Sequence, residues 1–307
     1  MAVMSITPTD RTLFARCRRA WDLGSRERRG LEPGDSAARN QDSFADSVRE
    51  ALAVHYFPGM WAWDRTIVAP LVLKAAAEAA PFVERYVDWA ASIDDFEPLR
   101  VEFDYDSRIP DPSGDGDLAA ADGRAAHYQG RADALVVDDH GTHWLLVHRL
   151  GPWTDGALLE LEEAAPTAAW AWEQTFLDAK VRGVLYNELD HTELERDGTF
   201  RRTRRRLSRA AVVAAGERLS AQVSLMVDPA VAVYPSPGEH CSTCPFVAPC
   251  RAMQDGRDAE AMLGEHFRPR GPDVPREGRL GGSTWGMGRG AMPVRFRSDD
   301  SGPTVQE

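Results

Sequence analysis

Three of the four cysteines stand close together in the stretch HCSTCPFVAPC, as Cys241, Cys244 and Cys250. The fourth, Cys17, lies far upstream in LFARCRRAWDL. Two thiols separated by two residues can chelate one centre, the third follows after five more residues, and Cys17 is the only thiol left to complete a set of four. Four thiolates suit either a tetrahedral zinc ion or an iron–sulfur cluster. The alternative for Cys17 is a small core residue on a helix face, because free cysteine is commonly buried.

The composition is that of a chain able to bury a sizeable core. It has 307 residues, of which 43% are hydrophobic and 27% charged, as in ordinary globular proteins. No run of about 18 apolar residues occurs, so we expect no membrane-spanning segment. The stretch MAVMSITPTDRTLF has no charged region followed by an apolar one, which favours a cytoplasmic location. In that reducing compartment, clustered cysteines are more often metal ligands or redox groups than disulfides.

The net charge of −12 argues against indiscriminate coating of DNA, which is driven by displaced counterions. The positive charge is nevertheless gathered in two arginine clusters. One contains Arg11, Arg16, Arg18, Arg19, Arg26, Arg28 and Arg29, and the other contains Arg201, Arg202, Arg204, Arg205, Arg206 and Arg209. The clustering permits a local stripe that could bind phosphates.

The elements that must position the cysteines follow from hydrophobic periodicity. A single helix capped by Thr9 or Asp10 is expected over 7–26, with Leu13, Phe14, Cys17 and Trp21 on one face. Further helices are expected over 40–57, 66–92, 156–180 and 208–227. A strand over 98–109, a hairpin over 127–151 and strands over 181–189 and 200–207 complete the pattern. Residues 1–266 are predicted to form one domain, and residues 267–307, rich in Gly, Pro and Arg, a disordered tail in which Trp285 and Met287 could anchor in a groove.

The stretches LFARCRRAWDLGSR and HCSTCPFVAPCRAM together resemble the split cysteine arrangement of RecB-like PD-(D/E)XK nucleases, such as AddB-type subunits and CRISPR-associated exonucleases. The strand–strand–strand–helix–strand order over 99–189 is similar to the core of that family. The resemblance implies an α/β fold with a PD-(D/E)XK restriction-endonuclease-like core, in which helices flank a mixed sheet. It also implies an N-terminal helical region and a structural four-iron, four-sulfur cluster on Cys17, Cys241, Cys244 and Cys250, with zinc as the alternative.

The resemblance also locates the family's catalytic pocket. Asp133, in GRAD, matches the first carboxylate that holds Mg²⁺ or Mn²⁺. On the next strand, in WLLVHRLG, Gly151 matches the family's glycine, whereas Val147 replaces the second acid and Arg149 replaces the lysine. Valine cannot bind a metal ion, and arginine stays protonated and cannot exchange protons. Strand alternation predicts that Asp133, Val147 and Arg149 lie together and that Arg149 pairs with Asp133 in place of a cation.

Other positions of the family pattern also differ. Arg49 takes the place of a histidine on an early helix, and Pro166 and Trp170 take the places of Gln and Tyr in a Q-x-x-x-Y motif. His148 is expected on the face opposite to the pocket. A migrated carboxylate could come from the helix that follows the hairpin. The candidates are Glu160, Glu162 and Glu163.

The sequence leaves three functions open, and whether the chain is an enzyme stays undecided. The first is an impaired or inactive RecB-like protein that binds nucleic acid or a partner in DNA repair, processing or defence. The second is an active metal-dependent DNA exonuclease that uses Asp133 and a migrated carboxylate. The third is a zinc-stabilised protein-interaction module. Because no Walker motif occurs, a helicase partner would be another chain.

Overall fold

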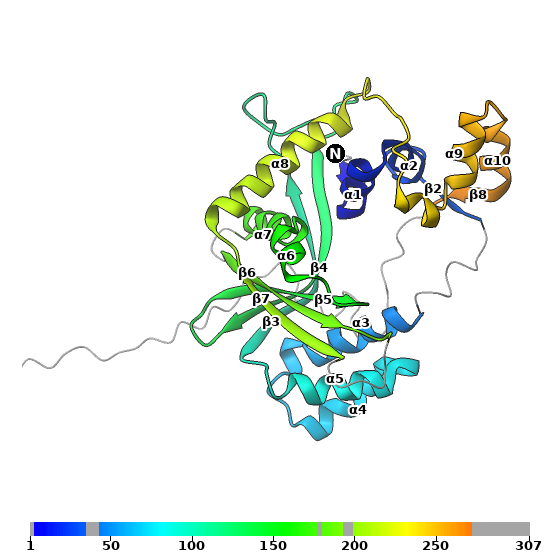
Figure 1. Cartoon of the computed structure of the whole chain (residues 1–307). Coiled ribbons are helices and arrows are strands. Elements are labelled where there is room, and N and C mark those ends of the chain that lie inside the picture. The colour runs from blue at the N-terminus through cyan, green and yellow to red at the C-terminus, as the bar shows by residue number, and fades with distance from the viewer. Residues whose placement is uncertain (1–2, 35–42, 177–179, 193–198, 272–307) are drawn as a thin grey trace, which may run out of the picture.

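The computed structural model describes residues 3–34, 43–176, 180–192 and 199–271, and a six-stranded mixed sheet forms its centre (Figure 1). The strands are β1 (Met4–Ile6), β3 (Phe96–Arg108), β4 (Ala126–Asp138), β5 (His143–Leu150), β6 (Val181–Leu189) and β7 (Phe200–Arg206). Strands β3, β4 and β5 form an antiparallel meander, β6 runs parallel to β5, and β7 runs antiparallel to β6. Strand β1 pairs in parallel with the start of β4. The predicted hairpin and the two later strands are confirmed.

Helices cover both faces of this sheet (Figure 1). One face carries α3 (Ser43–His55), α4 (Arg65–Ala76) and α5 (Ala80–Ala90), and the other carries α6 (Gly156–Leu161), α7 (Ala164–Thr175) and α8 (Arg209–Val227). Leu52 and Tyr86 pack with Leu146 on the first face, and Trp172 packs with Leu135 on the second. Successive residues of a strand point to opposite faces of the sheet. The central strands carry apolar side chains at successive positions, so both faces of the sheet are apolar and both are covered by helices. The fold is therefore a mixed α/β architecture with a sheet flanked by helices.

A smaller unit joins the two ends of the described chain. It contains α1 (Pro8–Arg16), α2 (Arg18–Gly24), β2 (Leu31–Pro33), η4 (Glu239–Thr243), α9 (Val247–Gln254), α10 (Ala259–His266) and β8 (Phe267–Pro269). Strand β2 pairs antiparallel with β8, and the ring of Phe267 stacks on that of Phe246 with centroids 5.2 Å apart. The packed chain thus continues past residue 266. Residues 272–307, with Trp285 and Met287, lie outside the described residues.

Three predicted helices are each divided in two. The helix over 7–26 breaks at Cys17, and its cap is Thr7, which forms a reciprocal capping box with Asp10. The helix over 66–92 breaks at Ala77, whose φ of 44° lies in the left-handed region, through η3 (Ala77–Ala79). The helix over 156–180 breaks where Glu162 is extended. Periodicity alone does not reveal these breaks, since the apolar pattern continues across each one.

Two helical stretches are long and apolar enough to cross a membrane by length and composition, Arg65–Ala90 and Arg209–Val227. The core helix of a globular domain meets the same criteria. The first stretch is interrupted by η3 and buries Tyr86, and the second buries Leu219 and Val223. Both therefore contribute to the two cores of this structure.

Candidate functional site

Cys17 lies at the break between α1 and α2, where its backbone is extended with φ −160° and ψ 109°. Its N–H donates to the Leu13 carbonyl at 2.8 Å, and its carbonyl accepts from the Trp21 N–H at 3.0 Å. The residue is 8% exposed. Since each helix satisfies one backbone group of Cys17, the two helices together fix the position of its thiol.

The other three cysteines lie on the turn and helix near the C-terminal end of the described chain. Cys241 is in η4, and Cys244 ends that turn by donating its N–H to the Cys241 carbonyl at 3.3 Å. Cys250 is in α9, where its N–H donates to the Phe246 carbonyl at 2.9 Å. The local hydrogen bonds therefore hold the three cysteines in one compact segment.

Cys17 lies in the same region of the fold as the three C-terminal cysteines. Cys17 and Cys244 belong to the same apolar cluster, together with Leu23. Burial raises the pKa of the Cys244 thiol, and the neighbouring charges of the other three cysteines raise it further. All four cysteines are free. Four thiolates in this arrangement would repel one another, and a cationic centre would remove that repulsion.

Two polar groups border the thiols. The Arg19 Nη1 atom donates to the Cys250 Sγ at 3.8 Å. The Nε2 atom of His240 is buried and has no hydrogen-bond partner among the described residues, although buried polar groups are normally paired. Within the described ranges, no group of three His, Cys, Asp or Glu side chains meets the geometry for holding one metal ion.

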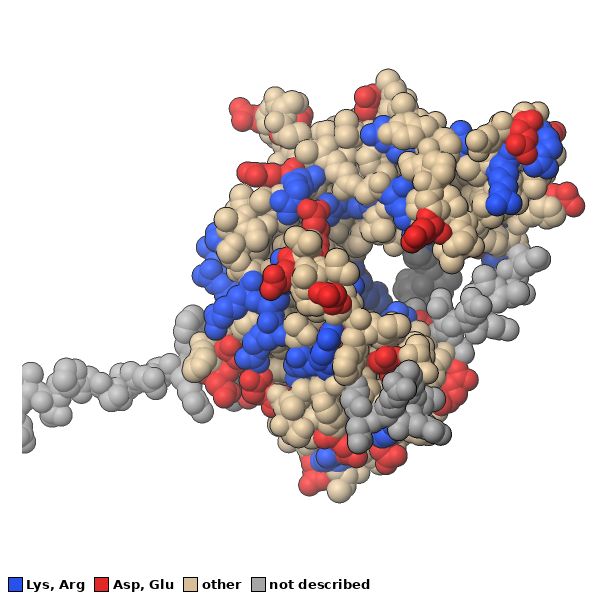
Figure 2. All heavy atoms as spheres, in the orientation of Figure 1, with Lys and Arg blue, Asp and Glu red and all other residues tan. Residues whose placement is uncertain are grey.

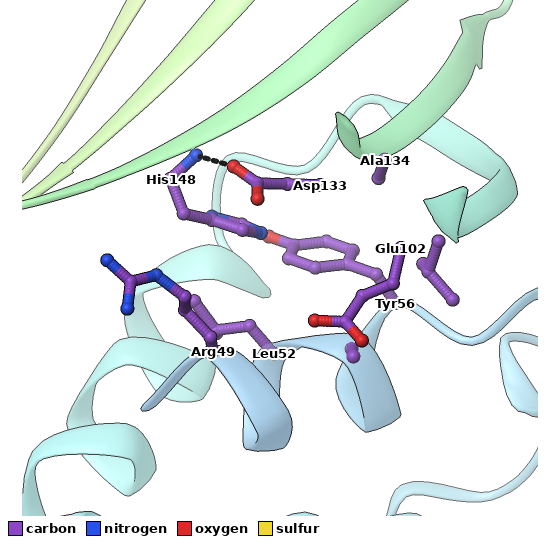
Figure 3. Close-up of a pocket in the computed structure, with 9 residues that line it drawn as sticks. Arg49, Leu52, Tyr56, Glu102, Asp133, Ala134 and His148 are labelled. Atoms are coloured by element: carbon purple, nitrogen blue, oxygen red, sulfur yellow. Dashed lines mark hydrogen bonds between the residues drawn. The ribbon is translucent and has the colours of Figure 1, made fainter. Parts of the chain in front are cut away.

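A second site lies between α3 and the sheet, around Asp133 (Figure 3). Its lining includes Arg49, Leu52, Tyr56, Glu102, Ala134 and His148. The backbone N–H of His148 donates to the Asp133 Oδ2 at 2.7 Å. Figure 3 shows the carboxyl groups of Asp133 and Glu102 on either side of the Tyr56 ring. The pocket therefore presents two acids from neighbouring strands.

Glu102 enters the pocket through an irregularity in β3. Its φ of 42° lies in the left-handed region, which residues other than glycine rarely adopt. The pairs Val101–Ala134 and Phe103–Ala132 place Glu102 opposite Asp133. Val101 packs against the α3–α5 face, whereas Phe103 packs against the α7–α8 face. Residues two apart on a regular strand share a face, so the strand turns over at Glu102.

The Asp133 carboxyl group is half-buried, and it has no counter-ion among the described residues. Burial raises its pKa from 3.8 to about 6, against the lowering effects of the His148 N–H and Arg49, and Glu102 raises it further. In the part of the chain that the structure describes, no cation lies within salt-bridge distance of Asp133. The negative charge of the Asp133 carboxylate is therefore not compensated, which favours binding of a proton or a cation at this site.

The predicted grouping of Asp133 with Val147 and Arg149 is wrong. Val147 packs against the α7–α8 face, and Arg149 Nη1 lies 3.3 Å from the Glu162 Oε1, with its guanidinium over the Tyr186 ring. Instead, His148, expected on the opposite face, lines the pocket. The regular alternation on which the prediction depended is broken around Asp133 and Glu102.

The predicted source of a migrated carboxylate is also not supported by the geometry. Glu162 accepts from the Tyr186 hydroxyl and pairs with Arg149. Glu163 pairs with Arg218 at 2.5 Å, and Glu160 is exposed. None of the three lines the pocket of Asp133. The acid that faces Asp133 is Glu102, on β3.

The three other positions of the family pattern lie in two different places in the fold. Arg49 does line the pocket, and it bonds Asp46 at 3.3 Å along its own helix. Pro166 and Trp170 are buried in α7, where Trp170 packs so closely under α8 that a Cβ on Gly216 would lie 2.3 Å from its Nε1. These two α7 residues therefore serve packing of the helix layer.

Seven of the thirteen clustered arginines are paired with carboxylates within the fold. The pairs are Arg11–Glu163, Arg28–Asp22, Arg29–Glu260, Arg201–Glu188, Arg202–Asp94, Arg204–Asp95 and Arg209–Glu173. Figure 2 shows a basic area over the β6–β7 side of the sheet, with acidic atoms interleaved. Among the described residues, Arg206 has no carboxylate partner. The basic surface is therefore neutralised in part.

A buried network behind the pocket was not anticipated from the sequence. Arg202 Nε donates to the Asn187 Oδ1 at 2.6 Å, and Asn187 Nδ2 donates to the Tyr86 hydroxyl at 2.6 Å. The Tyr56 and Tyr86 hydroxyls lie 2.6 Å apart, and the Tyr56 ring stacks on His148. Burial, followed by the charges of Arg202, His55 and Arg49, lowers the pKa of His148 to about 3, so its ring is neutral at physiological pH.

No protein-family model matches the sequence. No curated protein matches it either. Among solved structures, the crystal structure of SSO0001 is similar with 15% sequence identity and a TM-score of 0.33, covering 68% of this chain and 84% of that chain. A likeness at that score carries no argument about fold or function.

Proposed function

We propose that this chain is a RecB-like PD-(D/E)XK protein, closed by a four-iron, four-sulfur cluster and impaired in cleavage, that binds nucleic acid or a partner protein. The observation that carries the proposal is the meeting of Cys17 with Cys241, Cys244 and Cys250, from opposite ends of the described chain. A centre held by these thiols would fasten the N-terminal helices to the C-terminal segment. The cluster would then be part of the folding energy.

Four cysteine ligands suit either a cluster or a zinc ion, and the proposal takes the cluster because the spacing of the cysteines resembles that of the family. Zinc would hold four thiolates about 2.3 Å from one ion. A cluster places several irons between its ligands, so its thiolates stand further apart.

The order of the elements supports the proposed core. The helices α3, α4 and α5 are followed by the antiparallel strands β3, β4 and β5, then by α6 and α7, and then by β6, which runs parallel to β5. This is the order that the resemblance implies for a PD-(D/E)XK core. Fold does not fix function, however, and the pocket decides what chemistry remains.

The pocket supports impaired cleavage. Phosphodiester hydrolysis in this family uses carboxylates to hold a divalent cation and a lysine to orient or activate water. Val147 offers no ligand, and Arg149 is held away from Asp133 by Glu162. No lysine lines the pocket. Asp133 and Glu102 could retain a cation, but the group that moves protons is missing.

Binding of nucleic acid through few phosphate contacts follows from the arginine pairing. We expect weak affinity for single- and double-stranded DNA with a shallow dependence on salt, because seven of the thirteen clustered arginines are already paired with carboxylates. The test is fluorescence anisotropy of labelled DNA with anaerobically purified protein between about 50 and 200 mM salt. A steep salt dependence, or no binding to any DNA, would contradict the nucleic-acid half of the proposal and leave a protein partner such as a helicase.

A second candidate, an active nuclease, is favoured by one observation: Glu102 lines the same pocket as Asp133. Two opposed carboxylates are suitable ligands for Mg²⁺ or Mn²⁺. The test is a cleavage assay with each metal on single- and double-stranded DNA, using wild type, Asp133→Asn and Glu102→Gln. Cleavage that both substitutions abolish would establish this candidate, and absence of cleavage in the wild type would support the impaired form.

A further inference from the structure

We propose that Arg204 and Arg206, stacked together on the indole of Trp144 at the edge of the sheet, bind the phosphate backbone of a nucleic-acid strand. We call these two residues the arginine pair. The inference rests on the nucleic-acid half of the proposed function. It goes further by naming the surface that holds the strand, which is neither the pocket of Asp133 nor the cysteine segment.

A row of partners across three strands builds the platform for the arginine pair. Trp144 on β5 is the register partner of Gly183 on β6, and Gly183 is the partner of Arg206 on β7. A Cβ atom on Gly183 would clash with the Trp144 ring, so the indole occupies the space that a side chain on β6 would fill. The Trp144 Nε1 donates to the Asp138 Oδ2 at 3.0 Å, which fixes the orientation of the ring.

Both guanidinium groups of the arginine pair lie over this indole. The Cζ atoms of Arg204 and Arg206 are 5.1 and 5.7 Å from the centroid of the Trp144 ring, within the range of cation–π contacts. The two residues share one face of β7 and are about 7 Å apart along it. A stacked guanidinium keeps its N–H donors at the edge of its plane. The platform therefore orders both side chains before an anion binds, which lowers the entropy cost of binding.

The charge of the arginine pair is only partly compensated. Arg204 pairs with Asp95 at 2.6 Å, but the two side chains are 41% and 56% exposed, and exposed ion pairs are weak enough for a phosphate to compete. Arg206 is exposed and has no carboxylate partner in the part of the chain that the structure describes. By contrast, Arg202, on the same face of β7, is buried and paired with Asp94.

The surroundings of the arginine pair fit a phosphate backbone better than a folded protein partner. Within the described residues, β7 ends the sheet and has no strand on its outer side. None of the exposed large apolar side chains of these residues belongs to β6 or β7, whereas the centre of a protein interface is depleted of charge and apolar. Binding through charge and hydrogen bonds alone is typical of contacts to a nucleic-acid backbone.

The experiment measures anisotropy of labelled single-stranded DNA between about 50 and 200 mM salt with the full chain. It compares wild type, Arg204→Gln/Arg206→Gln and Arg206→Lys with the matched control Arg182→Gln. Arg182 is exposed, has no carboxylate partner among the described residues and precedes Gly183 on β6. Strand alternation directs its side chain to the face opposite to Trp144, so the control removes a nearby charge from the other side of the sheet.

Each phosphate contact on a single strand contributes about 0.7 to the slope of log K against log salt. The fall in affinity over this fourfold range of salt should therefore be about sevenfold smaller in Arg204→Gln/Arg206→Gln than in wild type. Arg206→Lys keeps the charge but not the fork or the stacking, so it should keep the slope and bind more weakly. Arg182→Gln should change the slope less than the double variant does.

The outcomes separate the proposed function from the role of the arginine pair. A wild-type protein that binds no DNA would overturn the nucleic-acid half of the proposed function. Wild-type binding with an unchanged slope in Arg204→Gln/Arg206→Gln, or with an equal change in Arg182→Gln, would overturn the role of the arginine pair alone. Tighter binding of poly-glutamate than of DNA, lost in the double variant, would replace the nucleic acid by an acidic protein partner and overturn the proposal.

Discussion

Asp133→Asn should stabilise the protein at pH 8 and do so much less at pH 5. Burial raises the pKa of the Asp133 carboxyl from 3.8 to about 6, so the folded state binds its proton more tightly than the unfolded state. Stability therefore falls as pH rises from about 4 through 6 and stays lowered above that range. Asparagine has the same shape and never ionises, which removes this penalty.

The size of the effect follows from the difference between 3.8 and about 6. At 1.36 kcal/mol per pH unit it amounts to about 3 kcal/mol at pH 8 and roughly half of that at pH 5. The assay is urea denaturation of wild type and Asp133→Asn at both pH values, without divalent metal. Asp104→Asn, which removes an exposed carboxylate that pairs with Arg131 on the same sheet, is the matched control and should show no comparable gain. A variant no more stable than wild type at pH 8 would refute the reasoning about the pocket.

Three further predictions concern the rest of the fold. The Cys17→Ser variant should lose most of its iron, as measured by metal analysis, and its segment with α9 and α10 should become sensitive to limited proteolysis. Full iron content in the variant would exclude Cys17 as a ligand. Arg202→Met should cost about 3–5 kcal/mol in urea denaturation, because Asp94, 6% exposed, would stay buried without its partner. The exposed Arg65→Met, whose pair with Asp88 is more than half exposed on both sides, should cost about 1 kcal/mol or less. Gly216→Ala should destabilise by about 1–3 kcal/mol because its Cβ would meet the Trp170 indole, whereas Gly264→Ala, with open space around it, should not; equal effects would contradict the α7–α8 packing.

The elements that carry the pocket and the cysteines were largely predictable because their signals are local. The hairpin with Asp133 follows from two alternating runs around a glycine turn, and β6 is the apolar run VRGVLYNEL. The cysteine set could be proposed from spacing and from there being only four thiols. That Cys17 lies at a helix break was not predictable, since the apolar face of 7–26 continues across it.

The composition of the pocket was not predictable, for a physical reason. Glu102 adopts a left-handed backbone conformation, which a glutamate in the sequence does not indicate. The irregularity of the strand pair at this point brings Asp133 to the same face of the sheet as His148. The pairing of Arg149 with Glu162 joins β5 to the residue between α6 and α7. Such contacts depend on how distant elements pack, and alternation along one strand carries no information about them.

The central claim is that four cysteines hold an iron–sulfur cluster that joins the two ends of the described chain. The most direct measurement is the iron, zinc and acid-labile sulfide content of the anaerobically purified chain, together with its visible spectrum. The account predicts about four iron and four sulfide atoms per chain with a broad absorbance near roughly 400 nm. A colourless protein with about one zinc ion per chain, or with no bound metal, would contradict it.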